Sequence, residues 1–167
     1  MPLSWVIRAS MVASISLMRF LSLLRSHFAS FSRRRRRSGF SLPPGPREEL
    51  SRYVLSRSHF SSTNQRVKYH AFLPEPRSME TSVFRIRGLR ADEIWDLGQR
   101  LVAGPLGRPL RARADIMTHE ILEVGLAIHP DNRPERHATI RGWPEEKERQ
   151  MILATELAAA AQLHVRS

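Results

Sequence analysis

Histidines and carboxylates are the residues of this sequence best suited to chemistry, because its 167 residues include seven His and no Cys. His129 and Asp131 have the His-x-Asp spacing of two ligands in a non-haem iron site. The third ligand would be His137, which follows only six residues later in a segment interrupted by Pro134. Such sites usually draw their last histidine from a distant strand. We therefore expect no metal and no cofactor.

Motifs of common catalytic sites are incomplete or missing from the sequence. His119 and Glu120 begin the zinc motif His-Glu-x-x-His, but Glu123 stands where the second His is needed. No serine lies in a Gly-x-Ser-x-Gly turn, and no glycine-rich phosphate loop occurs. His137 could still work as an acid or base together with Asp115 or Glu120. The catalytic candidates are His137 and Asp131. The sequence as a whole favours a role other than catalysis.

The segment 133–144 carries the side chains best suited to binding. Arg136 and His137 would contact an anionic or polar ligand, and Trp143 would stack on that ligand or on a partner protein. In the alternative interpretation, Trp143 packs between the sheet and the last helix, and His137 makes a structural hydrogen bond. The sequence leaves both interpretations open.

Alternating arginines on two expected strands offer a second kind of binding surface. The strands over 81–87 and 110–116 would each place two of them on one side: Arg85, Arg87, Arg111 and Arg113. If these strands are neighbours, the four guanidinium groups could bind the phosphates of nucleic acid. Alternatively, the arginines lie on a solvated face and pair with Glu80, Asp115 and Glu123.

Hydrophobic periodicity predicts five strands and three helices after residue 65. Alternating or short apolar runs predict strands over 66–72, 81–87, 110–116, 126–128 and 137–142. Apolar residues at helical spacing predict helices over 92–103, 118–124 and 143–165. The order β-β-α-β-α-β-β-α predicts a small α+β domain, with helices packed on a mostly antiparallel or mixed sheet.

Residues 1–65 differ in composition from the rest of the chain. They contain 15 serines, against three in 66–167, and residues 1–47 carry nine arginines and no acidic residue. Most of the formal net charge of +11 therefore lies there, and it includes the arginine run 33–37, either an anion-binding patch or a solvated stretch. We expect the folded domain to span 66–167. The extension before it would be disordered, a targeting segment, or the product of a start codon placed too far upstream.

These observations favour a small non-enzymatic binding module whose partner is another protein. The first alternative is a nucleic-acid- or anion-binding domain that uses the four arginines. The second is a small hydrolase built on His137, Asp131 and a neighbouring side chain. No run approaches the ~20 apolar residues of a membrane span. We therefore expect a cytoplasmic protein, or a mitochondrial or plastid one if the extension is a transit segment; the motifs indicate no characterised family and no particular oligomeric state.

Overall fold

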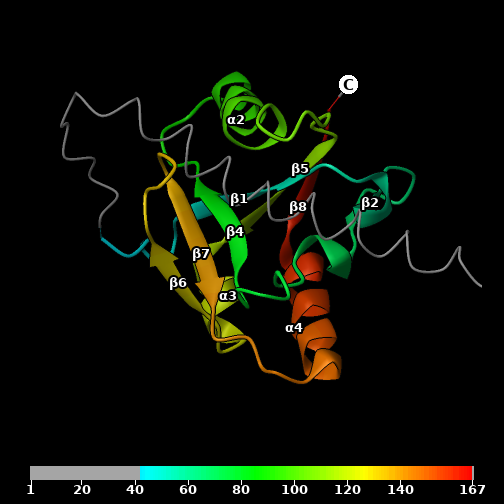
Figure 1. The fold of residues 1–167 in the computed structure, drawn as a ribbon, viewed down its shortest axis with the longest axis vertical. Helices are drawn as coiled ribbons and strands as arrows, with labels where there is room; N and C mark the ends of the chain where they lie inside the picture. The colour runs from blue at the N-terminus through cyan, green and yellow to red at the C-terminus, as the bar shows by residue number, and fades with distance from the viewer. Residues whose placement is uncertain (1–41, 167) are drawn as a thin grey trace, which may run out of the picture. The chain divides into compact units, whose positions relative to one another are not determined.

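Six antiparallel strands form the main sheet of the computed structural model, which describes residues 42–166 (Figure 1). In spatial order they are β6 (Ala127–Pro130), β7 (His137–Arg141), β4 (Thr81–Arg85), β1 (Glu49–Val54), β5 (Ala112–Met117) and β8 (Gln162–Val165). A separate two-stranded sheet contains β2 (Phe60–Ser61) and β3 (Arg66–Val67). The α+β class and the antiparallel sheet predicted from the sequence are confirmed.

Helices cover both faces of this sheet. One face is covered by α2 (Ala91–Gly98), which continues into the π-helical turn η3 (Gln99–Ala103). The other face is covered by α3 (Thr118–Glu123) and α4 (Lys147–Ala160). Two short 3-10 helices, η1 (Arg57–His59) and η2 (Tyr69–Ala71), follow β1 and β3. We refer to the two faces below as the α2 side and the α4 side.

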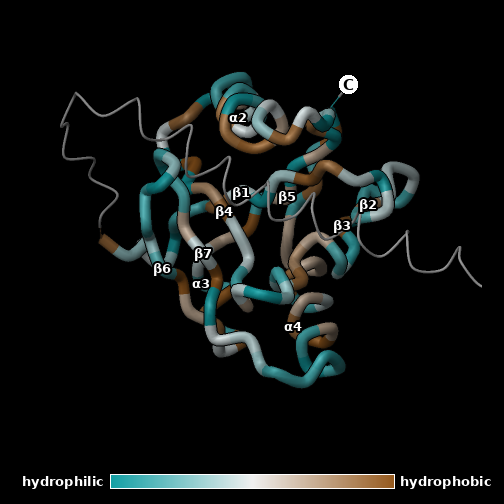
Figure 2. The backbone as a smooth tube through the Cα atoms, in the orientation of Figure 1, coloured by the Kyte–Doolittle hydropathy of each residue, from teal (hydrophilic) through white to brown (hydrophobic). Residues whose placement is uncertain are grey.

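A separate hydrophobic cluster fills the space on each side of the sheet. On β1, Leu50 and Val54 belong to the α4-side cluster and Tyr53 to the α2-side cluster, as the two-residue period of a strand requires. Other members on the α4 side include Val83, Ala114, Ile116, Ile140 and Leu157. Other members on the α2 side include Phe84, Ile86, Ile94 and Leu97. Hydrophobic and hydrophilic stretches alternate along the turns of α2, as expected for a helix with one buried face (Figure 2).

The position of β1 shows that the domain boundary expected at residue 66 is wrong. β1 lies inside the sheet and pairs with two strands, so that Leu50 is opposite Arg85 of β4 and Ile116 of β5. Residues from 42 onward therefore belong to the described fold. The interpretations given above for residues 1–41, including the arginine run 33–37, lie outside the described residues.

Polar residues in β1 conceal this strand in the sequence. Its residues are Glu-Leu-Ser-Arg-Tyr-Val, in which Ser51 and Arg52 interrupt the apolar pattern. In the structure Ser51 is buried, and the Arg52 guanidinium donates to the backbone carbonyls of Ala71 (2.8 Å) and Ser82 (2.9 Å). A central strand can carry an arginine here because main-chain oxygens accept its hydrogen bonds.

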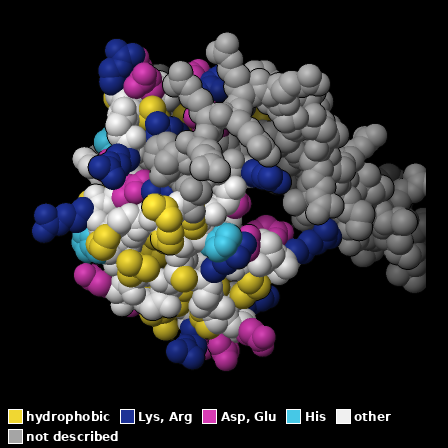
Figure 3. All heavy atoms as spheres, turned by 90° about the vertical axis from the view of Figure 1, so that its left-hand side faces the viewer, with side chains coloured by type: hydrophobic (Ala, Val, Ile, Leu, Met, Phe, Trp, Pro, Cys, Tyr) yellow, Lys and Arg dark blue, Asp and Glu magenta, His cyan; other side chains and the backbone are white. Residues whose placement is uncertain are grey.

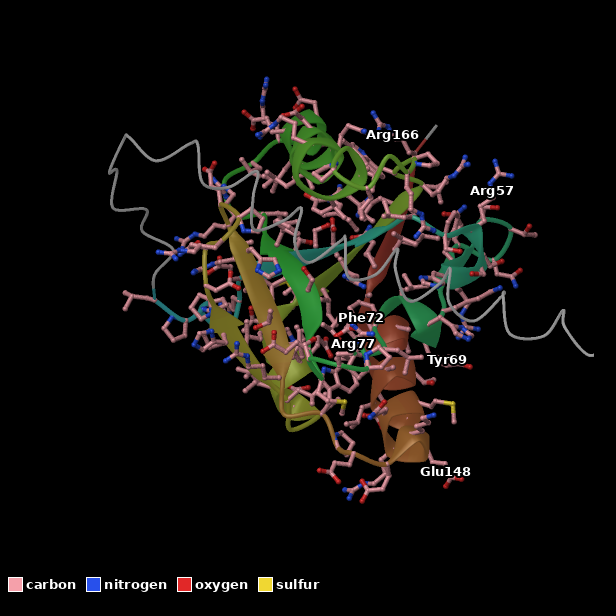
Figure 4. All side chains as sticks on the ribbon, viewed as in Figure 1. Arg57, Tyr69, Phe72, Arg77, Glu148 and Arg166 are labelled. Atoms are coloured by element: carbon pink, nitrogen blue, oxygen red, sulfur yellow. The ribbon has the colours of Figure 1, made fainter. Side chains whose placement is uncertain are left out.

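The stretch 66–72 is less extended than its alternating pattern predicts. Only β3 is a strand, and η2 then turns the chain. This turn brings Phe72 into the α4-side cluster, where its side chain is fully buried. Figure 4 shows Phe72 and Tyr69 beside α4. The apolar residues of this stretch thus reach the hydrophobic core because the chain turns, not because it forms a longer strand.

The last helix begins later and ends earlier than the apolar spacing predicts. It starts at Lys147 rather than Trp143 and ends at Ala160, and β8 follows after the extended residue Ala161. β8 pairs with β5, with Leu163 opposite Ala114. The free edge of β5 supplies backbone hydrogen bonds, and this tertiary pairing overrides the helical preference of the sequence.

Candidate functional site

Strands β4 and β7 bring Ser82 and His137 together on the α2 side of the sheet. The register places Ser82 opposite Thr139 and Phe84 opposite His137. Ser82 and His137 are therefore diagonal neighbours on one face, a separation that side chains on adjacent strands can bridge. Figure 1 shows β4 and β7 side by side, with the β6–β7 loop beyond them.

Hydrogen bonds join Ser82, His137 and Asp131 in a chain. Ser82 Oγ lies 2.5 Å from His137 Nε2, and Asp131 Oδ1 lies 2.7 Å from His137 Nδ1. The side chains of His137 and Asp131 are 12% and 33% exposed, so the chain is partly open to solvent. Hydroxyl, imidazole and carboxylate follow one another in the order of a Ser-His-Asp triad.

The loop between β6 and β7 holds Asp131 against the imidazole. Asp131 Oδ1 also accepts a hydrogen bond from the backbone N–H of Arg133, at 3.1 Å. The backbone N–H of Asn132 donates to the carbonyl of His137, also at 3.1 Å. Asn132 has a φ of 50°, a left-handed conformation that asparagine tolerates better than most residues. The tight turn therefore returns the carboxylate to the ring at the start of β7.

The environment of Asp131 keeps its carboxyl group ionised. Burial raises the pKa of Asp131. The hydrogen bond and charge of His137, together with the hydrogen bond from the Arg133 N–H, lower it by a larger amount, so the pKa lies below its ordinary value. An ionised carboxylate only accepts hydrogen bonds, so Nδ1 of His137 carries a proton. When the ring carries only this proton, Nε2 accepts the hydrogen bond of the Ser82 hydroxyl. This tautomer allows histidine to act as a base toward serine.

Two neighbours fix the ring and the strand on which the hydroxyl lies. Phe84 meets the His137 ring edge-on, with 5.2 Å between ring centroids and 67° between planes. Arg52 donates to the carbonyl of Ser82, which ties β4 to β1 next to the hydroxyl. The relative positions of Ser82, His137 and Asp131 thus depend on packing and on strand pairing as well as on the hydrogen bonds between them.

The structure brings two of the three predicted binding residues together and places the third elsewhere. Arg136 precedes His137 and donates through Nη1 to the carbonyls of Arg85 (3.2 Å) and Arg87 (3.0 Å). These bonds anchor the β6–β7 loop to the end of β4. Trp143 is only 7% exposed and packs in the α4-side cluster, whereas His137 lies on the α2 side.

The four arginines predicted to form one basic surface do not do so. β1 lies between β4 and β5, so the strands that carry them are not neighbours. Arg85 lies opposite Leu50 on the α4 side, whereas Arg113 lies on the α2 side. Arg87 is exposed and Arg111 is half-buried. The alternative of one basic surface required the two strands to be neighbours, and the structure does not meet this condition.

Arg85 and Arg113 are buried, and each forms an ion pair with a buried carboxylate. Arg85 donates through Nε and Nη2 to the two carboxylate oxygens of Glu48, at 2.6 and 2.7 Å. Arg113 pairs with Asp115 and lies over the ring of Trp95, 5.5 Å from its centroid. Burial raises the pKa of Asp115, although the charge of Arg113 opposes this shift. These charges neutralise one another inside the fold instead of facing a ligand.

Sequence reasoning missed Ser82, which lies in no catalytic motif. It is one of three serines after residue 65, and it falls within the strand predicted over 81–87. His137 begins the strand predicted over 137–142. Only the pairing and register of these strands bring the two side chains together, and the sequence pattern determines neither.

Metal binding, membrane insertion and similarity to known proteins give no further indication of function. Among residues 42–166, no three His, Asp or Glu side chains are grouped so that they could hold a metal ion. No helix in the described part of the chain is long and apolar enough to cross a membrane. Comparison with protein families, curated proteins and solved structures finds no match for this chain.

Proposed function

We propose that this protein is a serine-dependent hydrolase of acyl compounds such as carboxylic esters. The observation that carries the proposal is the hydrogen-bonded chain of Ser82, His137 and Asp131. Among the sequence-based hypotheses, it develops the small hydrolase built on His137, Asp131 and a neighbour. Ser82 is that neighbour.

The hydrolase is preferred to the non-enzymatic protein-binding module because it rests on a specific arrangement. A serine hydroxyl near a histidine is common on protein surfaces, but here an ionised carboxylate holds the opposite ring nitrogen and selects the tautomer. The protein-binding module rested on the lack of an intact motif and stays a prediction.

Ser82, His137 and Asp131 would catalyse ester hydrolysis in two steps, acylation and deacylation of the serine. Ser82 Oγ attacks the carbonyl carbon of the ester while its proton passes to Nε2 of His137. The bond to the leaving oxygen breaks, and His137 donates the proton to that oxygen, which leaves the acyl group on Ser82. Water then attacks this ester, and His137 passes a proton from the water to Ser82 as the carboxylic acid leaves. Asp131 stabilises the imidazolium that forms in each step.

An organophosphorus probe tests this proposal directly. A fluorophosphonate reacts with an activated serine, so the full chain is expected to gain one adduct, located on Ser82 by peptide mass spectrometry. Ser82→Ala should abolish the adduct. His137→Gln should slow labelling by about a hundredfold or more, since general-base catalysis contributes that much. Asp131→Asn should slow it as well because the amide no longer selects the tautomer.

Controls separate catalysis from a purely structural hydrogen-bond chain. Ser78→Ala removes an exposed serine near the same strand and should label at the rate of the unchanged protein. Thermal unfolding of each variant shows whether the fold persists. The hydrolase proposal is wrong if the folded His137→Gln protein is labelled as fast as the unchanged protein, or if the adduct lies on another serine. The hydrogen bonds between Ser82, His137 and Asp131 would then have only a structural role.

A further inference from the structure

A groove of about 410 Å³ lies on the α4 side of the molecule, at the end of the sheet away from α2. It is bounded by the α3–β6 turn, the β7–α4 connection and the first turns of α4. The residues that line it are Val124, Gly125, Leu126, Gly142, Pro144, Arg149, Ile152 and Leu153. Its volume falls in the range of sites that hold small molecules.

The walls of the groove are mostly apolar and are open to solvent at one side. Ile152 is 58% exposed although it lies next to the half-buried Leu153. Leu122 and Met151 are further exposed apolar side chains nearby in the sequence. Figure 3, which views the molecule from the β6 edge, shows hydrophobic side chains gathered on that face. An apolar groove with exposed apolar side chains beside it is a better candidate for a binding site than isolated apolar residues are.

Two glycines give the groove its backbone-lined part. Gly125 and Gly142 have φ values of +80° and +88°, conformations that residues with a side chain rarely adopt. No side chain projects from either position, so a ligand can approach the main chain closely.

Among the described residues, Arg149 is the only charged one that lines the groove. It lies on α4 and forms no ion pair with any residue of the range 42–166. Several other exposed arginines, such as Arg108, also form no such pair, whereas Arg90, Arg100 and Arg141 each pair with a nearby carboxylate. What distinguishes Arg149 is that its side chain lines the groove. An unpaired guanidinium beside apolar walls complements a ligand with an anionic head and an apolar body. Its planar fork matches a carboxylate in particular.

We infer that this groove binds a small aliphatic carboxylate, with the carboxylate on Arg149 and the chain along Ile152 and Leu153. The inference does not depend on the hydrolase proposal, because Ser82 and His137 lie on the α2 side of the sheet. Octanoate serves as the probe, and octanol serves as its uncharged counterpart.

Binding of octanoate to the full chain can be followed by two-dimensional amide NMR. We expect saturable shifts confined to residues 124–126, 142–144 and 149–153. Arg149→Gln should weaken octanoate binding about tenfold, as the loss of a charge-assisted hydrogen bond implies. The same variant should leave the weaker octanol binding unchanged. Ile152→Ser, at an exposed position, should weaken binding of both probes.

Matched controls make this result decisive. Arg108→Gln also removes one exposed positive charge, in the loop after η3, and should bind octanoate as the unchanged protein does. Ser82→Ala should also bind octanoate normally, so failure here is separable from failure of the hydrolase proposal. The inference is overturned if octanoate gives no saturable shifts, if Arg149→Gln binds it equally, or if only an apolar peptide occupies the groove.

Discussion

Glu48 and Arg85 form a buried ion pair whose two hydrogen bonds use both carboxylate oxygens. A third hydrogen bond joins Arg85 Nη1 to the carbonyl of Leu42 at 2.7 Å. Both side chains of the pair are almost fully buried, in contrast to the exposed pair of Arg90 and Asp92. Removing one partner of a buried pair leaves the other charge poorly solvated, which costs far more than breaking an exposed pair.

Glu48→Gln is expected to lower the free energy of unfolding at pH 7 by about 3 kcal/mol. Burial raises the pKa of Glu48. The hydrogen bond from Arg85 and the charge of Arg85 together lower it by a larger amount, so the pKa in the folded state lies below the ordinary value. Ionised Glu48 therefore stabilises the fold above the unfolded pKa, and this stabilisation is lost as pH falls through the folded pKa. The difference between the two proteins should shrink below about pH 4. Urea unfolding at several pH values measures it.

Asp92→Asn provides the exposed comparison for that experiment. Its pair with Arg90 is solvated, so the change should cost less than about 1 kcal/mol at pH 7. Equal losses for the Glu48 and Asp92 variants would show that burial does not determine the strength of these pairs.

Site residues could be predicted where they lie close together in the sequence, and could not be predicted where only strand pairing brings them together. His137 and Asp131 could be named because they fit the spacing of a metal-ligand motif. The structure shows that the short turn between β6 and β7 brings their side chains together. Ser82 could not be named, because its approach to His137 depends on strand pairing. Arg113 and Asp115 were expected to face solvent, but both are buried on the α2 side. Their alternation with Ala112 and Ala114 indicates a strand but does not show that helices cover both of its faces.

The contact between α2 and the sheet is close at one glycine. An added Cβ on Gly98 would lie 2.5 Å from two ring carbons of Tyr53. Tyr53 has little room to move, because it is buried and its hydroxyl donates to the carbonyl of Ile94 at 2.7 Å. The small residue therefore lets the helix lie directly on the aromatic ring.

Gly98→Ala is expected to lower the free energy of unfolding by about 1–3 kcal/mol. The overlap with Tyr53 opposes and exceeds the gain of about 1 kcal/mol that alanine brings to a helix. Gly45→Ala is the matched control, because no atom lies within 4 Å of its added Cβ and its φ is not positive. It should leave stability nearly unchanged. Thermal or urea unfolding compares the two, and an unchanged or more stable Gly98→Ala protein would contradict the packing argument.

Elements were predicted where periodicity is simple and missed where tertiary pairing decides. The strands near 81–87, 110–116 and 137–142 and the helices near 92–103 and 118–124 are present with small shifts of boundary. β1 was missed because an arginine and a serine fill its interior positions. β8 was missed because its residues continue the spacing of α4, and only the open edge of β5 makes them extended.

For the molecule as a whole, β1 determines where the domain can begin. Removing it would separate β4 from β5 and take Leu50, Tyr53 and Val54 out of the two hydrophobic clusters, which would expose their remaining members. We expect the fragment 66–167 to show no cooperative unfolding transition by circular dichroism, because a split sheet cannot offset the loss of chain entropy. The fragment 42–167 keeps every described strand and should unfold cooperatively. A cooperative transition in the shorter fragment would contradict this.

The position of β1 also affects the order in which the chain can fold during synthesis. β1 is made first, yet its neighbours β4 and β5 are complete only at Arg85 and Met117. Both edges of β1 are therefore unpaired until the chain reaches Arg85, and the edge that pairs with β5 stays unpaired until the chain reaches Met117. Such contacts between distant residues slow folding, and unpaired edges favour association with other chains. We therefore expect that protection of this segment on the ribosome limits such association and favours correct folding.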